Sequence, residues 1–122
     1  MTAEARLYTL SHMPQDEPMA GIARRRIMGE KAMVSEVQVD KGCEVPWHEH
    51  PNEQFVFLLE GRLQFDVAKP DGGRERHVMA PGDMLHLPGD VAHGGVALEN
   101  CRVLDIFSPP TEHAGIDRPG GS

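Results

Sequence analysis

Long apolar runs and paired cysteines are both missing from this sequence of 122 residues. No window approaches the roughly 18 consecutive apolar residues of a membrane-spanning helix, and Met1 to Leu10 lacks the apolar core of a secretion signal. Cys43 and Cys101 lie far apart and form no CxxC pair, so we expect two free thiols, with a bridge between them left open. These absences favour a cytoplasmic protein with no membrane partner.

Basic residues are also few. The formal net charge is -7, and the one basic run is Arg24-Arg25-Arg26. A protein that binds nucleic acid needs a cationic surface to neutralise phosphates, so a nucleic-acid partner is not expected. We expect the arginine run to form a solvated strand or turn edge.

Glycine and proline are plentiful, at 13 and 10 residues, and are scattered along the chain. This pattern predicts tight turns between short segments and therefore an all-β fold. The length fits a single domain over 1–122. Within it we expect an irregular lead-in over 1–19, a core barrel over about 20–110 and a frayed tail over 111–122.

Short apolar segments bounded by turns predict the strands. The run Phe55–Leu59 (FVFLL) is apolar throughout and predicts a strand buried on both faces, followed by a reversal at Gly61. The other expected strands are Met33–Val39, Leu63–Val67, Met84–Leu87, Val91–Leu98 and Cys101–Phe107. Strands this short indicate a sandwich or barrel.

Three histidines stand in an arrangement typical of a metal site. His48 and His50 are two residues apart, so both imidazoles lie on one side of an extended segment. Gln54 follows at the mouth of the next strand, and His93 lies at a later turn-to-strand boundary. Imidazoles from neighbouring strands could surround one ion. The other histidines, His12, His77, His86 and His113, match no ligand position.

Two segments resemble the motifs of the cupin superfamily. Gly42 to Gly61 has the first motif's spacing, with Gln54 where the family has a carboxylate, and Gly82 to His93 resembles the second motif. The resemblance implies a single-domain cupin, a double-stranded β-helix or jelly-roll barrel. It also implies one divalent ion (Ni, Zn, Fe or Mn) on His48, His50, Gln54 and His93, and a homodimer. Glu53 is the alternative to Gln54, but it would point to the opposite face of the strand.

Asp105 lies within the apolar strand Val103–Phe107. A buried carboxylate is costly unless it is paired, ligated or used. Asp105 is therefore either a hydrogen-bonded structural residue or an acid–base group whose pKa is raised by burial.

A closer resemblance is to the pectin-degradation cupins, which linearise 4,5-unsaturated monouronates released by pectate and alginate lyases. It is carried by His50 to Gln54 (HPNEQ), by Arg62 and by Arg102 to Pro110 (RVLDIFSPP). It implies an anionic small-molecule substrate and catalytic roles for Asp105 and Phe107.

This resemblance has one departure. The family's arginine after Pro-Pro is Thr111 here, and Arg24 or Arg26 would supply a cation if their strand faces the pocket. Trp47 is expected to pack at the barrel mouth or to line the pocket beside Phe107. The rival functions are a metal-dependent oxygenase or another lyase on the same scaffold, and a non-enzymatic module that binds a sugar acid or metal.

Overall fold

The computed structural model describes residues 3–112, and these form an all-β fold with one turn of 3-10 helix. The short helix is η1 (Leu10–His12). The strands are β1 (Asp16–Met19), β2 (Ile22–Met28), β3 (Met33–Val39), β4 (Glu44–His48), β5 (Glu53–Glu60), β6 (Leu63–Ala68), β7 (Arg74–Met79), β8 (Met84–Leu87), β9 (His93–Ala97) and β10 (Cys101–Ser108). The predicted fold class is confirmed.

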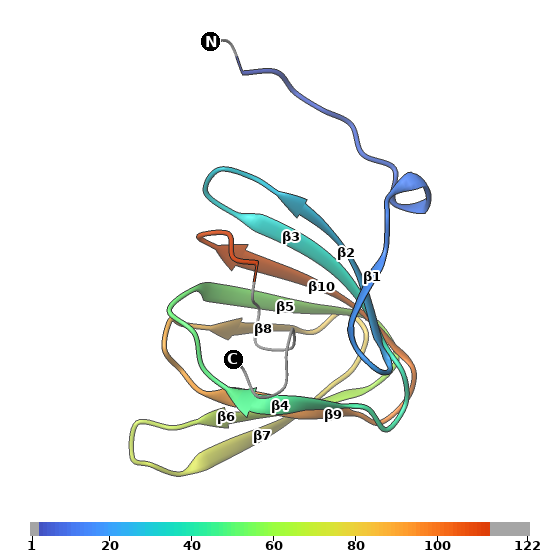
Figure 1. The fold of residues 1–122 in the computed structure, drawn as a ribbon. Coiled ribbons are helices and arrows are strands. Elements are labelled where there is room, and N and C mark those ends of the chain that lie inside the picture. Colours follow the sequence, from blue (N-terminus) through green and yellow to red (C-terminus); the bar gives the residue numbers. More distant parts are fainter. Residues whose placement is uncertain (1–2, 113–122) are drawn as a thin grey trace.

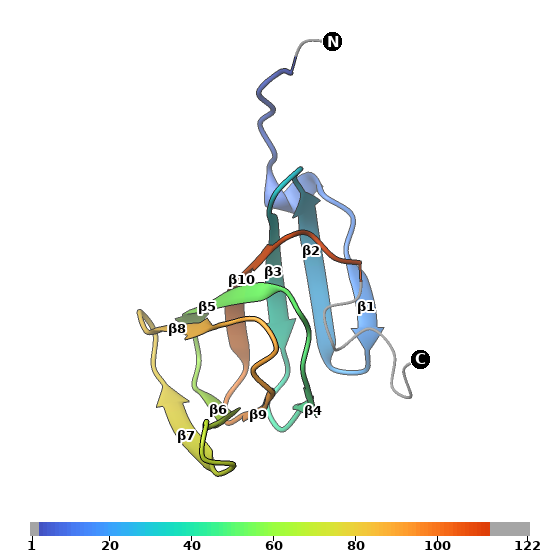
Figure 2. The ribbon, with the colours of Figure 1, turned by 90° about the vertical axis from the view of Figure 1, so that its left-hand side faces the viewer.

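Two antiparallel sheets face each other across the interior (Figure 1). One has six strands in the order β1-β2-β3-β10-β5-β8, and the other has four in the order β4-β9-β6-β7. Strands β1 and β2 extend past the four-stranded sheet, as Figure 2 shows. Some strands, such as β3 and β10, are neighbours in the sheet although they are distant in sequence. Side chains from the first and last thirds of the chain therefore line the same interior.

The expected irregular lead-in over 1–19 contains a strand, because β1 (Asp16–Met19) lies within it and pairs with β2. Pro18 lies in β1, where the missing N–H is tolerated because β1 is an edge strand. At the other end of the chain, most of the predicted tail lies outside the described residues. Among residues 3–112 no helix is long and apolar enough to cross a membrane. Both cysteines are free thiols, as expected.

The prediction for β5 was wrong in one respect. Its residues alternate between buried and partly buried, so only one face, with Val56 and Leu58, belongs to the core. Phe55 and Phe57 lie on the outer face of the six-stranded sheet and are partly exposed. The reversal after β5 has Gly61 at a φ of 95°, as the sequence predicted.

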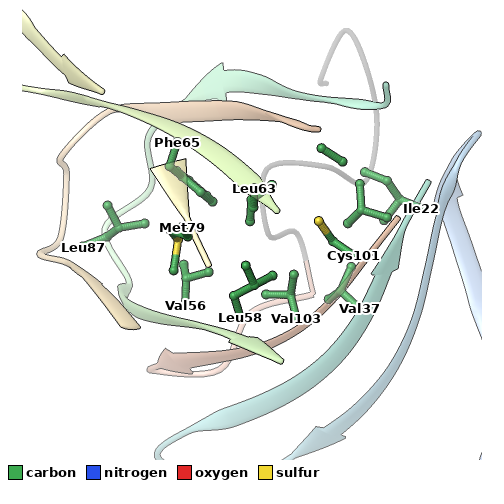
Figure 3. Packing of buried hydrophobic residues seen from close by; sticks show 12 residues of the cluster. Ile22, Val37, Val56, Leu58, Leu63, Phe65, Met79, Leu87, Cys101 and Val103 are labelled. Atoms are coloured by element: carbon green, nitrogen blue, oxygen red, sulfur yellow. The ribbon is translucent and has the colours of Figure 1, made fainter. Parts of the chain in front are cut away.

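Hydrophobic side chains from both sheets fill one end of the interior (Figure 3). Along β10 the inward residues change from Cys101 and Val103 in this core to Asp105 and Phe107. Along β5 they change from Leu58 to Gln54 over the same distance. The strands therefore carry an apolar core at one end and polar groups at the other, and the polar end is where the histidines lie.

Candidate metal centre

Three histidines meet at this polar end. His48 at the end of β4 and His93 at the start of β9 are direct cross-strand partners, so their side chains share one face of the four-stranded sheet. A register irregularity between Val45 and His48 sets this pairing. His50 follows in the loop to β5. Its ring centroid lies 5.1 Å from that of His93 and 5.4 Å from that of His48.

The same hydrogen-bond pattern orients all three rings. The Nδ1 atoms donate to backbone carbonyl oxygens: His48 to Pro46 at 2.6 Å, His50 to Asn52 at 3.0 Å and His93 to Val91 at 2.9 Å. Each bond fixes a tautomer in which Nε2 carries the lone pair. The candidate ligand atoms of the three histidines lie within 4.8 Å of one another.

The cluster suits a metal ion on two independent grounds. The Nε2 atoms of His48 and His93 are buried and have no hydrogen-bond partner among the described residues, an arrangement that costs free energy unless a ligand fills it. Burial also lowers the pKa of His48 and lowers that of His93 to about 4, so both rings are neutral at physiological pH. Neutral imidazoles with inward lone pairs are the form that binds divalent metals.

Gln54 joins this cluster to Asp105. The Gln54 side chain is buried, its Oε1 lies 3.1 Å from Nε2 of His50, and its Nε2 donates to Oδ1 of Asp105 at 3.1 Å. The amide therefore presents its oxygen to the histidines and its nitrogen to the carboxyl. Glu53 points the other way and contacts His86 at 2.6 Å on the outside of the sheet. Glu53 and Gln54 are neighbours in an extended strand and therefore point to opposite faces of the sheet, as argued from the sequence.

Asp105 and Phe107 face inward from β10, as their spacing predicted. Burial raises the pKa of Asp105 to about 7, and the hydrogen bond from Gln54 opposes this shift only in part. Phe107 is 2% exposed, and its ring centroid lies 5.6 Å from that of His50. Asp105 and Phe107 line one cavity together with His48, Gln54 and His93.

The sequence analysis missed two features of this cavity and left a third, the direction of Arg24, open. Asn52 is buried and donates from Nδ2 to the carbonyl of Pro109 at 2.6 Å, so it ties the loop carrying His50 to the end of β10. Ser35 lies opposite Asp105 on β3 and lines the cavity. Arg24 lines it too and is 2% exposed, so the expectation of a solvated arginine is wrong for this residue, and its strand faces the pocket as the alternative required. Of these residues, Asn52 could have been found from the sequence, because it lies between the candidate ligands His50 and Gln54.

Trp47 does not line the cavity. Its side chain is 40% exposed, and the Arg74 guanidinium lies 3.8 Å from the ring centroid. Its ring packs against Arg74 instead of forming a wall of the pocket beside Phe107. Thr111 lies just beyond β10 and is partly exposed. Among residues 3–112, His48, His50 and His93 form the one group of metal-binding type, and His12, His77 and His86 lie outside it, as expected.

Comparisons with known proteins agree with this fold. A KdgF structure from Halomonas sp. is 25% identical with a TM-score of 0.77, over 88% of this chain and 97% of the other. An RmlC-like cupin from Shewanella frigidimarina NCIMB 400 is 26% identical with a TM-score of 0.78, over 92% and 97%. Oxalate decarboxylase from Bacillus subtilis, a protein with Mn(II) centres, shares the fold at 16% identity and a TM-score of 0.81. There the match covers 93% of this chain and 32% of the other.

No curated protein matches the sequence significantly. The model of the cupin domain matches residues 35–107, which is more than half of the chain and includes every residue of the histidine cluster. The chain belongs to the cupin family.

Proposed function

We propose that this cupin is a metal-dependent enzyme that acts on a small anionic sugar acid, converting 4,5-unsaturated monouronates to linear ketonic sugar acids. The observation that carries the proposal is the link from the histidine cluster through Gln54 to Asp105. It places a carboxyl that can exchange protons near neutral pH beside a site that suits a divalent ion.

His48, His50 and His93 would hold the ion through Nε2, with the Oε1 of Gln54 as the fourth donor. A divalent ion bound by four neutral donors keeps its full double charge and supplies a Lewis acid that attracts a carboxylate or hydroxyl. The Gln54 amide also fixes Asp105, since its Nε2 donates to Oδ1 at 3.1 Å. One side chain thus sets the position of the acid relative to the cluster.

Asp105 is the proton donor and acceptor in this proposal. A pKa of about 7 means that protonated and ionised forms are both populated at neutral pH, which is the optimum for general acid–base catalysis. The substrate is an enol ether with a C4=C5 double bond next to its carboxylate. Asp105 would give its proton to C4, water would add at C5, and the water's proton would return to Asp105. The resulting hemiketal opens to the keto acid.

Phe107 supplies the wall that orients the sugar ring. Its side chain is buried against Met33 and lies edge-on to the ring of His50. An apolar ring can contact the C–H face of a sugar and keep bulk water away from Asp105, which sustains the raised pKa. The sequence resemblance to uronate-linearising cupins and the fold shared with KdgF support the same substrate class.

Turnover of unsaturated monouronates tests the proposal. Metal-loaded protein is incubated with products of pectate or alginate lyases, and the absorbance of the conjugated C4=C5 carboxylate is followed. We expect the signal to disappear with the wild type and to persist with Asp105→Asn. Glu53→Gln is the matched control, because Glu53 lies on the same wall of the barrel but faces outward. That variant should retain wild-type turnover.

The rival functions give different outcomes. Oxygen uptake that requires iron, with no loss of the conjugated signal, would identify an oxygenase. Binding of monouronates without turnover under any metal would identify a non-enzymatic module. Either result overturns the proposal.

A further inference from the structure

The loop 49–52 between β4 and β5 is hydrogen-bonded to both segments that complete the site. The carbonyl oxygen of Asn52 accepts the bond from Nδ1 of His50 at 3.0 Å. The carbonyl oxygen of His50 accepts from the backbone N–H of Asp90, in the turn before β9, at 2.8 Å. The Asn52 side chain donates from Nδ2 to the carbonyl oxygen of Pro109, just after β10, at 2.6 Å. The loop therefore connects the His50 ring with the start of β9 and the end of β10.

His50 depends on its loop more than the other two histidines of the cluster depend on theirs. His48 ends β4 and His93 begins β9, and the two are direct partners in the four-stranded sheet, so the sheet itself fixes their spacing. His50 lies outside the strands, and its main chain is positioned by the contacts of the loop. Whatever anchors the loop 49–52 therefore sets where the His50 ring lies.

Asn52 anchors this loop to β10. The pairing of β5 with β10 ends at Glu53 and Ser108. Asn52 and Pro109 come next along the two chains, and Pro109 has no N–H with which to continue the ladder. The Asn52 side chain supplies a link by donating to the Pro109 carbonyl, while the Asn52 carbonyl accepts from His50. Asn52 is 6% exposed, and burial of an amide is costly without such a bond.

The position requires a side chain that donates. Alanine would leave the Pro109 carbonyl without this donor, and an ionised aspartate would place a carboxylate against that carbonyl oxygen, so that two acceptors face each other. In both cases the main chain at position 52 loses its bond to the end of β10, and the carbonyl that orients the His50 ring is released with it. Groups that orient metal ligands in this way typically contribute about ten- to hundredfold to metal affinity.

We propose that Asn52 is a positioning residue of the metal centre, because its bond to the end of β10 holds the carbonyl that fixes the tautomer and direction of the His50 ring. Asn52 itself is not a ligand in this proposal. This role rests on the metal site of the proposed function and not on its substrate. All the candidate ligands remain in an Asn52 variant, so a change in metal coordination reports their positioning.

Titration with Co²⁺ and a competing chelator measures this role, because the visible absorption of bound Co²⁺ reports the number and geometry of its ligands. Metal-free wild type, Asn52→Ala and His50→Ala are titrated at one pH. We expect Asn52→Ala to bind Co²⁺ about ten- to hundredfold more weakly, with a spectrum shifted toward that of His50→Ala. Asn52→Asp is nearly isosteric, so it keeps the test decisive if the alanine variant does not fold. It should also bind Co²⁺ more weakly, although its negative charge alone would attract the ion.

Ser108→Ala is the matched control. Ser108 also ties the end of β10 to a neighbouring segment, since its Oγ donates to the carbonyl oxygen of Lys31 at 2.7 Å. Strands β3 and β5 flank β10 on opposite sides, and this bond to the turn between β2 and β3 lies on the side away from the loop 49–52. Ser108→Ala should match the wild type in Co²⁺ affinity and spectrum, even if urea denaturation shows a loss of stability similar to that of Asn52→Ala.

Three results would overturn the role of Asn52. Wild-type Co²⁺ affinity and spectrum in the folded Asn52 variants would make Asn52 a structural residue only. An equal loss of affinity in Ser108→Ala would mean that metal binding follows the stability of the end of β10 in general. Wild-type protein that binds no Co²⁺ would leave no centre for Asn52 to position. The reaction is judged separately, because Co²⁺ binding that depends on Asn52, without turnover of unsaturated monouronates, rejects the proposed reaction and leaves this role standing.

Discussion

Asp105 should make the unfolding free energy of the metal-free protein depend on pH. The isosteric substitution Asp105→Asn should remove this dependence. Its pKa is raised from about 3.8 to about 7 in the folded state. Between these values the unfolded chain has lost this proton while the folded chain keeps it. Folded protein then binds more protons than unfolded protein, so stability falls as pH rises from about 4 to about 7. Asn at position 105 cannot ionise, and its side-chain oxygen can still accept the hydrogen bond from Gln54.

The size of the effect follows from the shift. A pKa difference of about 3 units corresponds to about 4 kcal/mol, because each unit contributes about 1.4 kcal/mol. This figure is an upper limit, since water entering the cavity reduces it. We therefore expect Asp105→Asn and the wild type to be nearly equal in stability at pH 4. At pH 8 the variant should be more stable by about 2 to 4 kcal/mol.

Urea denaturation in the presence of a chelator measures this difference at several pH values between 4 and 8. Taking the difference between the two proteins cancels the histidine titrations, which both share. A difference in unfolding free energy that does not grow with pH would refute the reasoning, because Asp105 would then ionise normally inside the fold. The chelator is needed because a bound cation would favour the ionised carboxylate.

Four further predictions concern other parts of the molecule. Gln54→Glu adds an anionic donor and should bind a divalent ion at least about tenfold more tightly in chelator competition, with unchanged affinity counting against Gln54 as a ligand. Burial lowers the pKa of His93 from 6.5 to about 4, so between these pH values the unfolded chain is protonated at His93 and the folded chain is not. Relative to His93→Leu, metal-free wild type should therefore lose up to about 3 kcal/mol of unfolding free energy between pH 6.5 and pH 4; urea denaturation of both proteins measures this difference, in which the opposing Asp105 titration cancels. Gly61→Ala would place a Cβ against the backbone carbonyl oxygen of Asn100 and should destabilise by more than about 2 kcal/mol. Gly72→Ala, with the same sign of φ and open space around it, should cost about 1 kcal/mol, so equal melting temperatures of the two variants would contradict this. Met84 is 61% exposed on the outer sheet face, and we expect the homodimer to bury it. Met84→Glu should therefore reduce the mass measured by light scattering from that of two chains to that of one. A wild-type mass of one chain would refute this expectation.

The sequence predicts those parts of the site that depend on which side chains of a strand face inward. His48 and His50 at a spacing of two, and Gln54 rather than Glu53, follow from the period of two along an extended chain. The inward direction of Asp105 follows in the same way. The partnership of His93 with these residues required the motif resemblance, because the register of β4 with β9 is not encoded in either segment alone.

Burial on β2 and β5 could not be predicted locally. Arg24 belongs to a run of three arginines that looks solvated, and its inward direction follows from the register of β2 with β3, which is not visible in the run itself. Phe55 and Phe57 are as apolar as the core residues between them. Which face of β5 is covered depends on the second sheet, which packs against Val56.

Metal binding by the purified protein tests the central claim most directly. Metal-free protein is titrated calorimetrically with Zn²⁺ and, in parallel, with Ni²⁺, and the stoichiometry is checked by elemental analysis. We expect one ion per chain, with binding lost or at least about a hundredfold weaker in His48→Ala and His93→Ala and unchanged in His77→Ala, whose partly exposed imidazole lies on β7 outside the cluster. Wild-type protein that binds neither metal, or His93→Ala protein that binds as the wild type does, would contradict it.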